Sequence, residues 1–284
     1  MYPKDFEYQH QDTQPGLEAL MNPKPIFENP NYKGSNKLMN KVAVITGGDS
    51  GIGKAVALVF AAEGADIVIS YLNEHCDAEE TKTLIEKKGR QCLLIPGDIG
   101  EEGFCNKIIN DTINTFGHID ILVNNAAVQY PQNSIMDITA EQLMLTFKTN
   151  FFSMFYLTKA AVPHMKEGSS IINTTSVTAY EGHETLIDYS ATKGAINTFT
   201  RSLSLNLANA GIRVNGVAPG PIWTPLIPSS FSKEKVANFG HNTPMGRAGQ
   251  PCEVAGAYAF LASEDSSYIS GQVIHINGGK ITTS

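Results

Sequence analysis

The sequence contains no apolar run long enough to cross a bilayer, and its first residues carry no apolar signal core. Its four cysteines are scattered without any Cys-x-x-Cys pair, a usage typical of reduced thiols in an intracellular protein. Lysine and arginine form no clusters, and the formal net charge of −7 argues against nucleic acid or a membrane surface as the main partner. The histidines show no metal-ligand spacing, so no metal site is predicted. By elimination, we expect a cytoplasmic protein.

What remains is the composition of a globular protein. Hydrophobic residues make up 42% of the 284 residues and charged residues 17%, which are ordinary values. This length fits one large α/β domain, or one domain with an extension, and is sufficient to bury a full core.

The first 38 residues differ from the rest because they are polar and rich in proline. Proline fixes φ and removes a backbone donor, so no regular helix is expected here beyond a short turn near residues 17–21. Two interpretations stay open. The segment is either a mobile tail, or an arm that packs on its own or a neighbouring subunit through Ile26, Phe27 and Tyr32. We favour the arm, because a solvated tail has little use for these apolar side chains.

From residue 39 onward, short β-rich runs alternate with segments of helical periodicity. The expected strands are 42–46, 67–71, 92–96, 119–124, 170–175, 213–218 and 273–276. The expected helices include 54–63, 78–88, 104–116, 140–166 and 191–210. This alternation predicts an α/β fold, a doubly wound, seven-stranded parallel sheet covered by helices on both faces. Residues 39–284 are predicted to form one Rossmann-fold domain that holds both the cofactor and the substrate sites.

A glycine-rich turn follows the first expected strand, where residues 46–53 read Thr-Gly-Gly-Asp-Ser-Gly-Ile-Gly. Gly47, Gly51 and Gly53 allow a tight turn and a close approach of the backbone to a pyrophosphate. The helix that begins near Ile52 directs its amides and the positive end of its dipole at the phosphates. We therefore predict a dinucleotide site at this turn.

Tyr189 and Lys193 lie four residues apart on an expected helix, so their side chains share one face. Ser176 follows an expected strand and should project into the same crevice. A free phenol has a pKa of about 10, and a nearby ammonium group favours the phenolate. A phenol and an ammonium beside a dinucleotide form the acid/base pair that hydride transfer to a carbonyl requires.

Together these motifs resemble the short-chain dehydrogenase/reductase family, over about residues 39 to 280. The resemblance is greatest to the glucose/ribitol dehydrogenase homologues and bacterial general stress oxidoreductases. It implies that Tyr189 is the general acid in reduction and the general base in oxidation, while Ser176 holds the substrate oxygen. It further implies that Lys193 lowers the Tyr189 pKa and orients the nicotinamide ribose. Asn150 is implied to brace a water that relays protons to Lys193.

The resemblance also implies contacts to the cofactor at the ends of several strands. Asp98 is expected to meet the adenine amino group, and Asn124 to brace the central strands. Ala127 stands where the family has glycine. The full set of expected cofactor residues is Gly47, Asp49, Ser50, Gly51, Ile52, Tyr71, Leu72, Asn73, Asp98, Ile99, Asn124, Ala126, Ala127, Thr174, Tyr189, Lys193, Pro219, Gly220, Ile222 and Thr224.

The sequence does not decide between NAD and NADP. At the end of the second strand an acidic residue would bind the ribose 2′-hydroxyl, but Tyr71 stands there. Ser50 stands where NADP-preferring members of the family often carry a cation. Asp49 and Glu74 are close enough to influence the choice.

The predicted function is that of an NAD(P)-dependent oxidoreductase acting on a small aldehyde, ketone, sugar or polyol. Gln129, Ser176, Tyr180 and Trp223 are expected to form the substrate pocket. The family resemblance implies a homotetramer. The alternative is a non-catalytic NAD(P)-binding scaffold or redox sensor.

Overall fold

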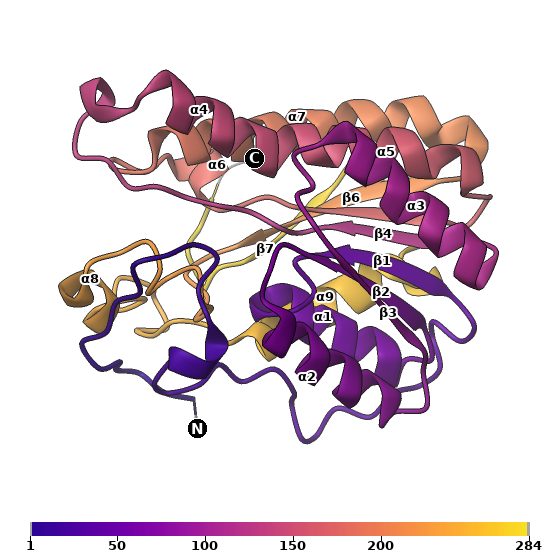
Figure 1. Cartoon of the computed structure of the whole chain (residues 1–284), viewed down its shortest axis with the longest axis horizontal. Coiled ribbons are helices and arrows are strands. Elements are labelled where there is room, and N and C mark those ends of the chain that lie inside the picture. Colours follow the sequence, from indigo (N-terminus) through magenta and orange to yellow (C-terminus); the bar gives the residue numbers. More distant parts are fainter. Residues whose placement is uncertain (1, 283–284) are drawn as a thin grey trace.

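Seven parallel strands form one sheet in the computed structural model, which describes residues 2–282 (Figure 1). The strands are β1 (Val42–Thr46), β2 (Asp66–Tyr71), β3 (Cys92–Pro96), β4 (Ile121–Asn124), β5 (Ser170–Thr174), β6 (Arg213–Pro219) and β7 (Val273–Ile276). Their order in space is β3-β2-β1-β4-β5-β6-β7, so the winding direction reverses between β1 and β4. The predicted doubly wound parallel sheet is confirmed, and ligands bind such sheets at the reversal.

Helices cover both faces of this sheet, with α1, α2 and α9 on one face and α3, α5 and α7 on the other (Figure 1). The α-helices are α1 (Gly51–Ala62), α2 (His75–Glu86), α3 (Glu102–Phe116), α4 (Ala140–Phe147), α5 (Ser153–Ala161), α6 (Thr178–Glu181), α7 (Ile187–Leu207), α8 (Lys233–Ala237) and α9 (Pro251–Ala262). Short 3-10 turns are η1 (Glu18–Leu20), η2 (Ile135–Asp137), η4 (Val162–His164), η5 (Ala208–Ala210) and η6 (Glu264–Ser266). None of the helices formed by residues 2–282 has the length and hydropathy needed to cross a membrane.

The two faces of the sheet bury separate apolar clusters. Along β1, Ile45 packs into the cluster beneath α1 and α9, while its neighbour Val44 packs into the cluster beneath α3 and α5. In β5, Ile172 and Ile171 divide in the same way. Successive side chains of a strand point to opposite faces, so the centre of a strand buried on both faces is apolar at consecutive positions. This explains the short hydrophobic runs in the sequence.

The single helix expected over residues 140–166 is wrong. The structure divides this stretch into α4, a π-helical turn η3 (Lys148–Phe152), α5 and the 3-10 turn η4. The π turn contains Asn150, whose side chain binds the backbone of Val128 outside the helix. Pro163 stands at the start of η4, where the regular helix ends. A π turn keeps the apolar periodicity nearly continuous, so the pattern did not reveal it.

The N-terminal segment packs on the rest of the same chain as an arm. Phe6 and Met21 are buried in a cluster with Trp223, and Leu38 is fully buried beneath α1. The three expected anchors also contact the domain. The amide of Ile26 donates to the Gln250 side chain, the Phe27 ring lies 4.4 Å from the Lys54 ammonium, and the Tyr32 hydroxyl binds Glu63. Of the two open interpretations, the structure therefore contains the packed arm (Figure 1).

Candidate active site

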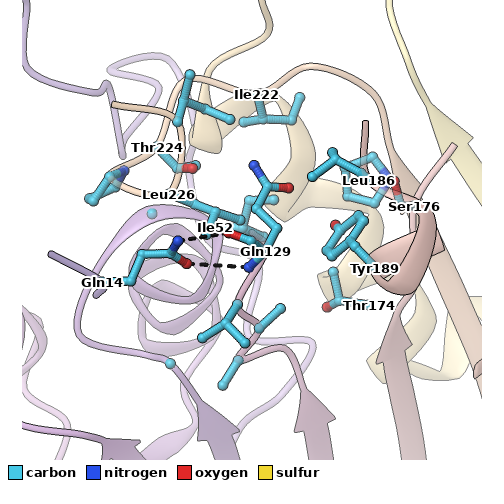
Figure 2. Close-up of a pocket in the computed structure, with 18 of the residues that line it drawn as sticks. Gln14, Ile52, Gln129, Thr174, Ser176, Leu186, Tyr189, Ile222, Thr224 and Leu226 are labelled. Carbon is cyan, nitrogen blue, oxygen red and sulfur yellow. Dashed lines mark hydrogen bonds between the residues drawn. The ribbon is translucent and has the colours of Figure 1, made fainter. Parts of the chain in front are cut away.

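A cavity of about 800 Å³ lies at the carboxyl ends of the strands, where the winding direction reverses. The glycine-rich turn after β1 forms one side, and the residues after β5 and the start of α7 form another. The N-terminal arm and the segment after β6 complete the wall (Figure 2).

The backbone of the glycine-rich turn folds so tightly that two of its glycines, Gly47 and Gly53, leave little or no room for a side chain. Gly47 has φ +62°, a conformation that favours glycine, and an added Cβ would lie 3.1 Å from the Ala126 Cα. A Cβ on Gly53 would lie 1.9 Å from the Gly47 carbonyl oxygen. These approaches bring the start of α1 close to the end of β1, and residues 49–52 of the turn line the cavity, as a pyrophosphate site requires.

Most of the expected cofactor residues line this cavity. They are Gly47, Asp49, Ser50, Gly51, Ile52, Tyr71, Leu72, Asp98, Ile99, Ala126, Ala127, Thr174, Tyr189, Lys193, Pro219, Gly220, Ile222 and Thr224. Asn73 and Asn124 do not. Asn73 is exposed beyond the end of β2. Asn124 is fully buried and donates to the Asn173 side chain at 2.9 Å, which joins β4 to β5. Its bracing contact is the one that the family resemblance implied.

The three polar groups expected to perform the chemistry lie together. Tyr189 and Ser176 lie on one wall of the cavity (Figure 2). The ammonium nitrogen of Lys193 lies 5.4 Å from the centroid of the Tyr189 ring and donates to the Thr174 carbonyl oxygen at 2.9 Å. The Ser176 hydroxyl oxygen accepts from the Thr178 amide at 3.1 Å, which fixes its position at the start of α6.

Burial controls the protonation of this pair. It raises the pKa of Tyr189 to about 12, opposed by the neighbouring Ser176 hydroxyl, and it lowers the pKa of Lys193 to about 7. Burial therefore outweighs any effect of Lys193 on the phenol in the protein by itself. The expected lowering of the Tyr189 pKa by Lys193, to which the charge of an oxidised nicotinamide would add, stays a prediction.

Asn150 holds the wall of the cavity without lining it. Its side chain is fully buried. The amide oxygen accepts from the Val128 amide at 2.8 Å, and the amide nitrogen donates to the Val128 carbonyl at 2.9 Å and to the Thr192 hydroxyl at 3.3 Å. Asn150 thereby joins the loop after β4 to α7. Its expected role in a water relay stays a prediction.

Two of the four expected substrate residues are misplaced. Gln129 and Ser176 line the cavity, but Trp223 and Tyr180 do not. Trp223 is fully buried against the arm, where its ring stacks on Phe6 with centroids 3.8 Å apart and its indole nitrogen donates to the Pro23 carbonyl at 2.8 Å. The Tyr180 ring packs edge-on against His275.

Sequence reasoning missed two groups of residues that shape the site. Asn125 donates to the Thr46 carbonyl at 3.1 Å and accepts from the Thr174 hydroxyl at 3.3 Å, linking three strand ends. It stands directly after Asn124, so its position in the motif could have revealed it. Gln14, Pro15 and Gly16 of the arm also line the cavity. No pattern in the arm signals this, because its fold depends on contacts with distant segments.

The part of the cavity formed by α6, α8 and the segment after β7 carries polar and charged side chains beside apolar ones, among them Leu186, Phe231 and Phe239. Its side chains include Glu181, His183, Glu184, Lys235, Asn238, His241, Asn242 and Lys280. Lys280 pairs with Glu181 at 3.2 Å. This wall supplies both donors and acceptors of hydrogen bonds.

Comparison with known proteins finds relatives over nearly the whole chain. The family model described as enoyl-(acyl carrier protein) reductase matches residues 47–280. The uncharacterized oxidoreductase YhdF of Bacillus subtilis (strain 168) is 63% identical over 274 residues, 96% of this chain and 95% of the relative. Glucose and ribitol dehydrogenase of Daucus carota is 54% identical over 282 residues, 97% of each chain.

Solved structures agree with this relationship. A short-chain dehydrogenase from Burkholderia cenocepacia J2315 in complex with NADP matches with a TM-score of 0.81 and 30% identity, over 86% of this chain and 98% of that chain. The resemblance inferred from the glycine-rich turn and the Tyr-Lys pair is confirmed. The chain belongs to the short-chain dehydrogenase/reductase family and is an NAD(P)-dependent oxidoreductase.

Proposed function

We propose that this oxidoreductase interconverts a small carbonyl compound and its alcohol, with Tyr189 as the proton donor in reduction. The observation that carries the proposal is the placement of Tyr189 and Ser176 on one wall of a cavity whose other side is the glycine-rich turn. The residues of that turn and of the strand ends would hold a nicotinamide dinucleotide, which supplies the hydride.

The protonation states suit reduction near neutral pH. With a pKa raised to about 12 by burial, Tyr189 keeps its proton and can donate it to a developing alkoxide. Ser176 holds a second hydroxyl against the same oxygen and stabilises its charge. Lys193 is fixed by the Thr174 carbonyl beside the Tyr189 ring and would bind the ribose hydroxyls of the dinucleotide. In oxidation, the phenolate accepts the proton instead.

A preference for NAD over NADP is part of the proposal. The carboxyl groups of Asp49 and Glu74 line the cavity at the glycine-rich turn and after β2. Burial, with the charge of Glu74, raises the pKa of Asp49 to about 7. Among residues 2–282, the lysines that line the cavity are Lys193, Lys235 and Lys280, which lie on α7, on α8 and after β7. A ribose 2′-hydroxyl could bind these carboxyl groups, whereas a 2′-phosphate would meet negative charge without a cation.

The polar side chains on α6, on α8 and after β7 support a hydroxylated substrate, such as a sugar, a polyol or a short hydroxyaldehyde. Two relatives are named for such chemistry, the glucose and ribitol dehydrogenase of Daucus carota and the NADPH-dependent aldehyde reductase 1 of Arabidopsis thaliana, 54% identical each. Because the aldehyde reductase is named as NADPH-dependent, both nucleotides must be tested.

The test is a panel of aldehydes, ketones, sugars and polyols, each assayed with NAD(H) and with NADP(H) by the absorbance of the reduced nicotinamide. We expect turnover of hydroxylated aldehydes or polyols, with a higher kcat/KM for NAD(H). Nucleotide binding without turnover of any compound would contradict the enzymatic proposal and favour the scaffold alternative. A higher kcat/KM with NADP(H) would contradict the assigned effect of Asp49 and Glu74.

We also propose that the protein assembles as a homotetramer. Large apolar side chains are exposed along the helices that carry the site, namely Leu143 and Met144 on α4, Phe155 on α5 and Leu205 on α7. Apolar surface of this kind is typical of a subunit interface, and symmetric pairing would cover it on each copy. Native mass spectrometry tests this proposal, and a monomer at micromolar concentration would contradict it.

A further inference from the structure

The N-terminal arm reaches the substrate wall of the cavity through one side chain. The amide nitrogen of Gln14 donates to the Gln129 carbonyl at 2.7 Å, and the Gln129 amide donates back to the Gln14 side-chain oxygen at 3.2 Å (Figure 2). The two residues are 115 positions apart in the sequence. A glutamine amide offers one donor and one acceptor side by side, so it pairs with both backbone groups of a residue as a neighbouring strand would.

Val128, the residue before Gln129, is held in the same manner by a side chain of the helical layer. Asn150, in the π turn, pairs with both backbone groups of Val128. Two consecutive residues of the loop after β4 are thus fixed by two side-chain amides, one from the helical layer and one from the arm. Without the Gln14 side chain, the amide and the carbonyl of Gln129 would each lose the hydrogen bond that Gln14 supplies.

Gln129 itself presents an acceptor to the cavity. Its side chain is buried and lines the cavity, and its amide nitrogen donates to the Ser230 hydroxyl at 2.8 Å. Within residues 2–282, no hydrogen bond is made to its side-chain oxygen. Figure 2 shows this amide facing the wall that carries Tyr189 and Ser176. The oxygen can therefore accept a hydrogen bond from a substrate hydroxyl.

The arm residues that follow Gln14 contact the domain closely, and these contacts fix the position of Gln14. A Cβ on Gly16 would lie 2.5 Å from the Pro225 carbonyl oxygen, so the arm lies directly on the segment after β6. Two residues further, the buried carboxylate of Glu18 accepts from the Gly51 amide at 3.0 Å and binds the buried Lys54 ammonium at 2.8 Å. The arm is thereby joined to the helix that begins at the glycine-rich turn.

We propose that Gln14 is a positioning residue of the active site, which sets the place of Gln129 so that its side-chain oxygen binds a hydroxyl of the substrate. The N-terminal arm is then a part of the substrate-binding wall. This inference rests on the proposed reduction of hydroxylated carbonyl compounds. It adds a substrate-binding role to a segment that lies outside the matched family region, residues 47–280.

The test compares three variants of the full-length protein. Gln14→Ala removes the hydrogen bonds to the Gln129 carbonyl and amide. Gln14→Glu keeps the shape of the side chain but places an oxygen, which cannot donate, against the Gln129 carbonyl. Gln9→Ala is the matched control, because the Gln9 side chain also pairs with the backbone of another residue, Asn22, but does not line the cavity. The first readout is hydrogen exchange at the Gln129 amide, which needs no turnover. The second is the KM for D-glyceraldehyde with NADH, beside the dissociation constant of NADH.

We expect exchange at the Gln129 amide to become about tenfold faster in Gln14→Ala, which removes the acceptor of that amide. Gln14→Glu keeps an acceptor for the amide and loses only the donor to the Gln129 carbonyl, so exchange should not become faster there. The KM for D-glyceraldehyde should rise about tenfold, while NADH binding stays within about twofold and Gln9→Ala changes neither quantity. The fluorescence of Trp223, the single tryptophan, should keep its buried emission because the arm remains attached.

Three results would overturn the inference. Unchanged exchange in Gln14→Ala would contradict the pairing with Gln129. Faster exchange with an unchanged KM would contradict the link to substrate binding. A red shift of Trp223 emission would show that the whole arm had detached and that Gln14 had no local role. If the unmodified enzyme does not turn over D-glyceraldehyde, the KM is measured with a hydroxylated substrate found in the panel. If the panel contains none, the substrate proposal fails, and hydrogen exchange still decides the role of Gln14 in positioning Gln129.

Discussion

Replacing Phe6 with alanine should detach the start of the arm from the domain. The Phe6 ring is 6% exposed and stacks on Trp223, with centroids 3.8 Å apart and planes inclined by 14°. Trp223 is fully buried, and one face of its ring is covered by Phe6. Alanine at position 6 would leave either a cavity against the indole or a path for water to reach it.

The expected cost follows from the size of the lost ring. Truncation of a buried phenylalanine to alanine costs about 3–5 kcal/mol. For a chain of this size, each kcal/mol lowers the midpoint of thermal unfolding by roughly 2–4 °C. We therefore expect a decrease of about 6–12 °C for a cost near the lower limit. A part of the arm can detach while the sheet stays folded, so the loss should appear first as local opening around Trp223.

Tryptophan fluorescence reports this opening without ambiguity, because Trp223 is the single tryptophan of the chain. Its emission should shift to longer wavelength in Phe6→Ala and become accessible to iodide. The control is Tyr8→Ala, which removes an aromatic ring two residues away that is 70% exposed. Equal emission and an equal melting temperature in Phe6→Ala and the unmodified protein would refute the packing described for the arm.

Three further predictions concern the chemistry. Ser176→Ala should lower kcat/KM for reduction by about 10²–10³ while the nucleotide dissociation constant stays unchanged, because one donor to the developing alkoxide is lost. Because burial raises the pKa of Tyr189 to about 12, the phenol stays protonated, and kcat/KM for reduction should stay level from pH 6 to 9. Oxidation needs the phenolate, so kcat/KM for oxidation should rise about tenfold per pH unit over the same range. A level oxidation profile would contradict this assignment. Gly53→Ala should abolish nucleotide binding in calorimetric titration, because its Cβ would lie 1.9 Å from a backbone carbonyl oxygen, whereas Gly103→Ala, which meets no atom within 4 Å, should bind normally.

The sequence predicted the sheet and the inner part of the site because both depend on local patterns. The centres of β1 and β5 are apolar on both faces, which marks strands buried on both faces. The glycine-rich turn and the Tyr189–Lys193 spacing each bring their chemistry within one short segment, so no long-range contact had to be known. The cytoplasmic location has no direct test in the structure and stays a prediction.

The misplaced residues depend on contacts between distant segments. Trp223 follows a strand end where ligands bind such sheets, but the arm supplies Phe6 as a partner for its ring and takes it out of the cavity. The π turn at Asn150 forms together with the loop at Val128, and neither segment by itself indicates the other. Gln14 reaches the site for the same reason. Such contacts between distant segments leave no periodicity and no motif in the sequence, so only the three-dimensional structure reveals them.

The replacement Tyr189→Phe tests the central claim most directly, because it removes the phenolic oxygen and keeps the ring. Turnover of a substrate found in the panel should be measured beside the nucleotide dissociation constant. The account predicts a fall in kcat of about 10²–10⁴, the usual contribution of a general acid, with nucleotide binding within about twofold of the unmodified enzyme. A variant that keeps its full kcat would contradict the assignment of Tyr189 as the proton donor.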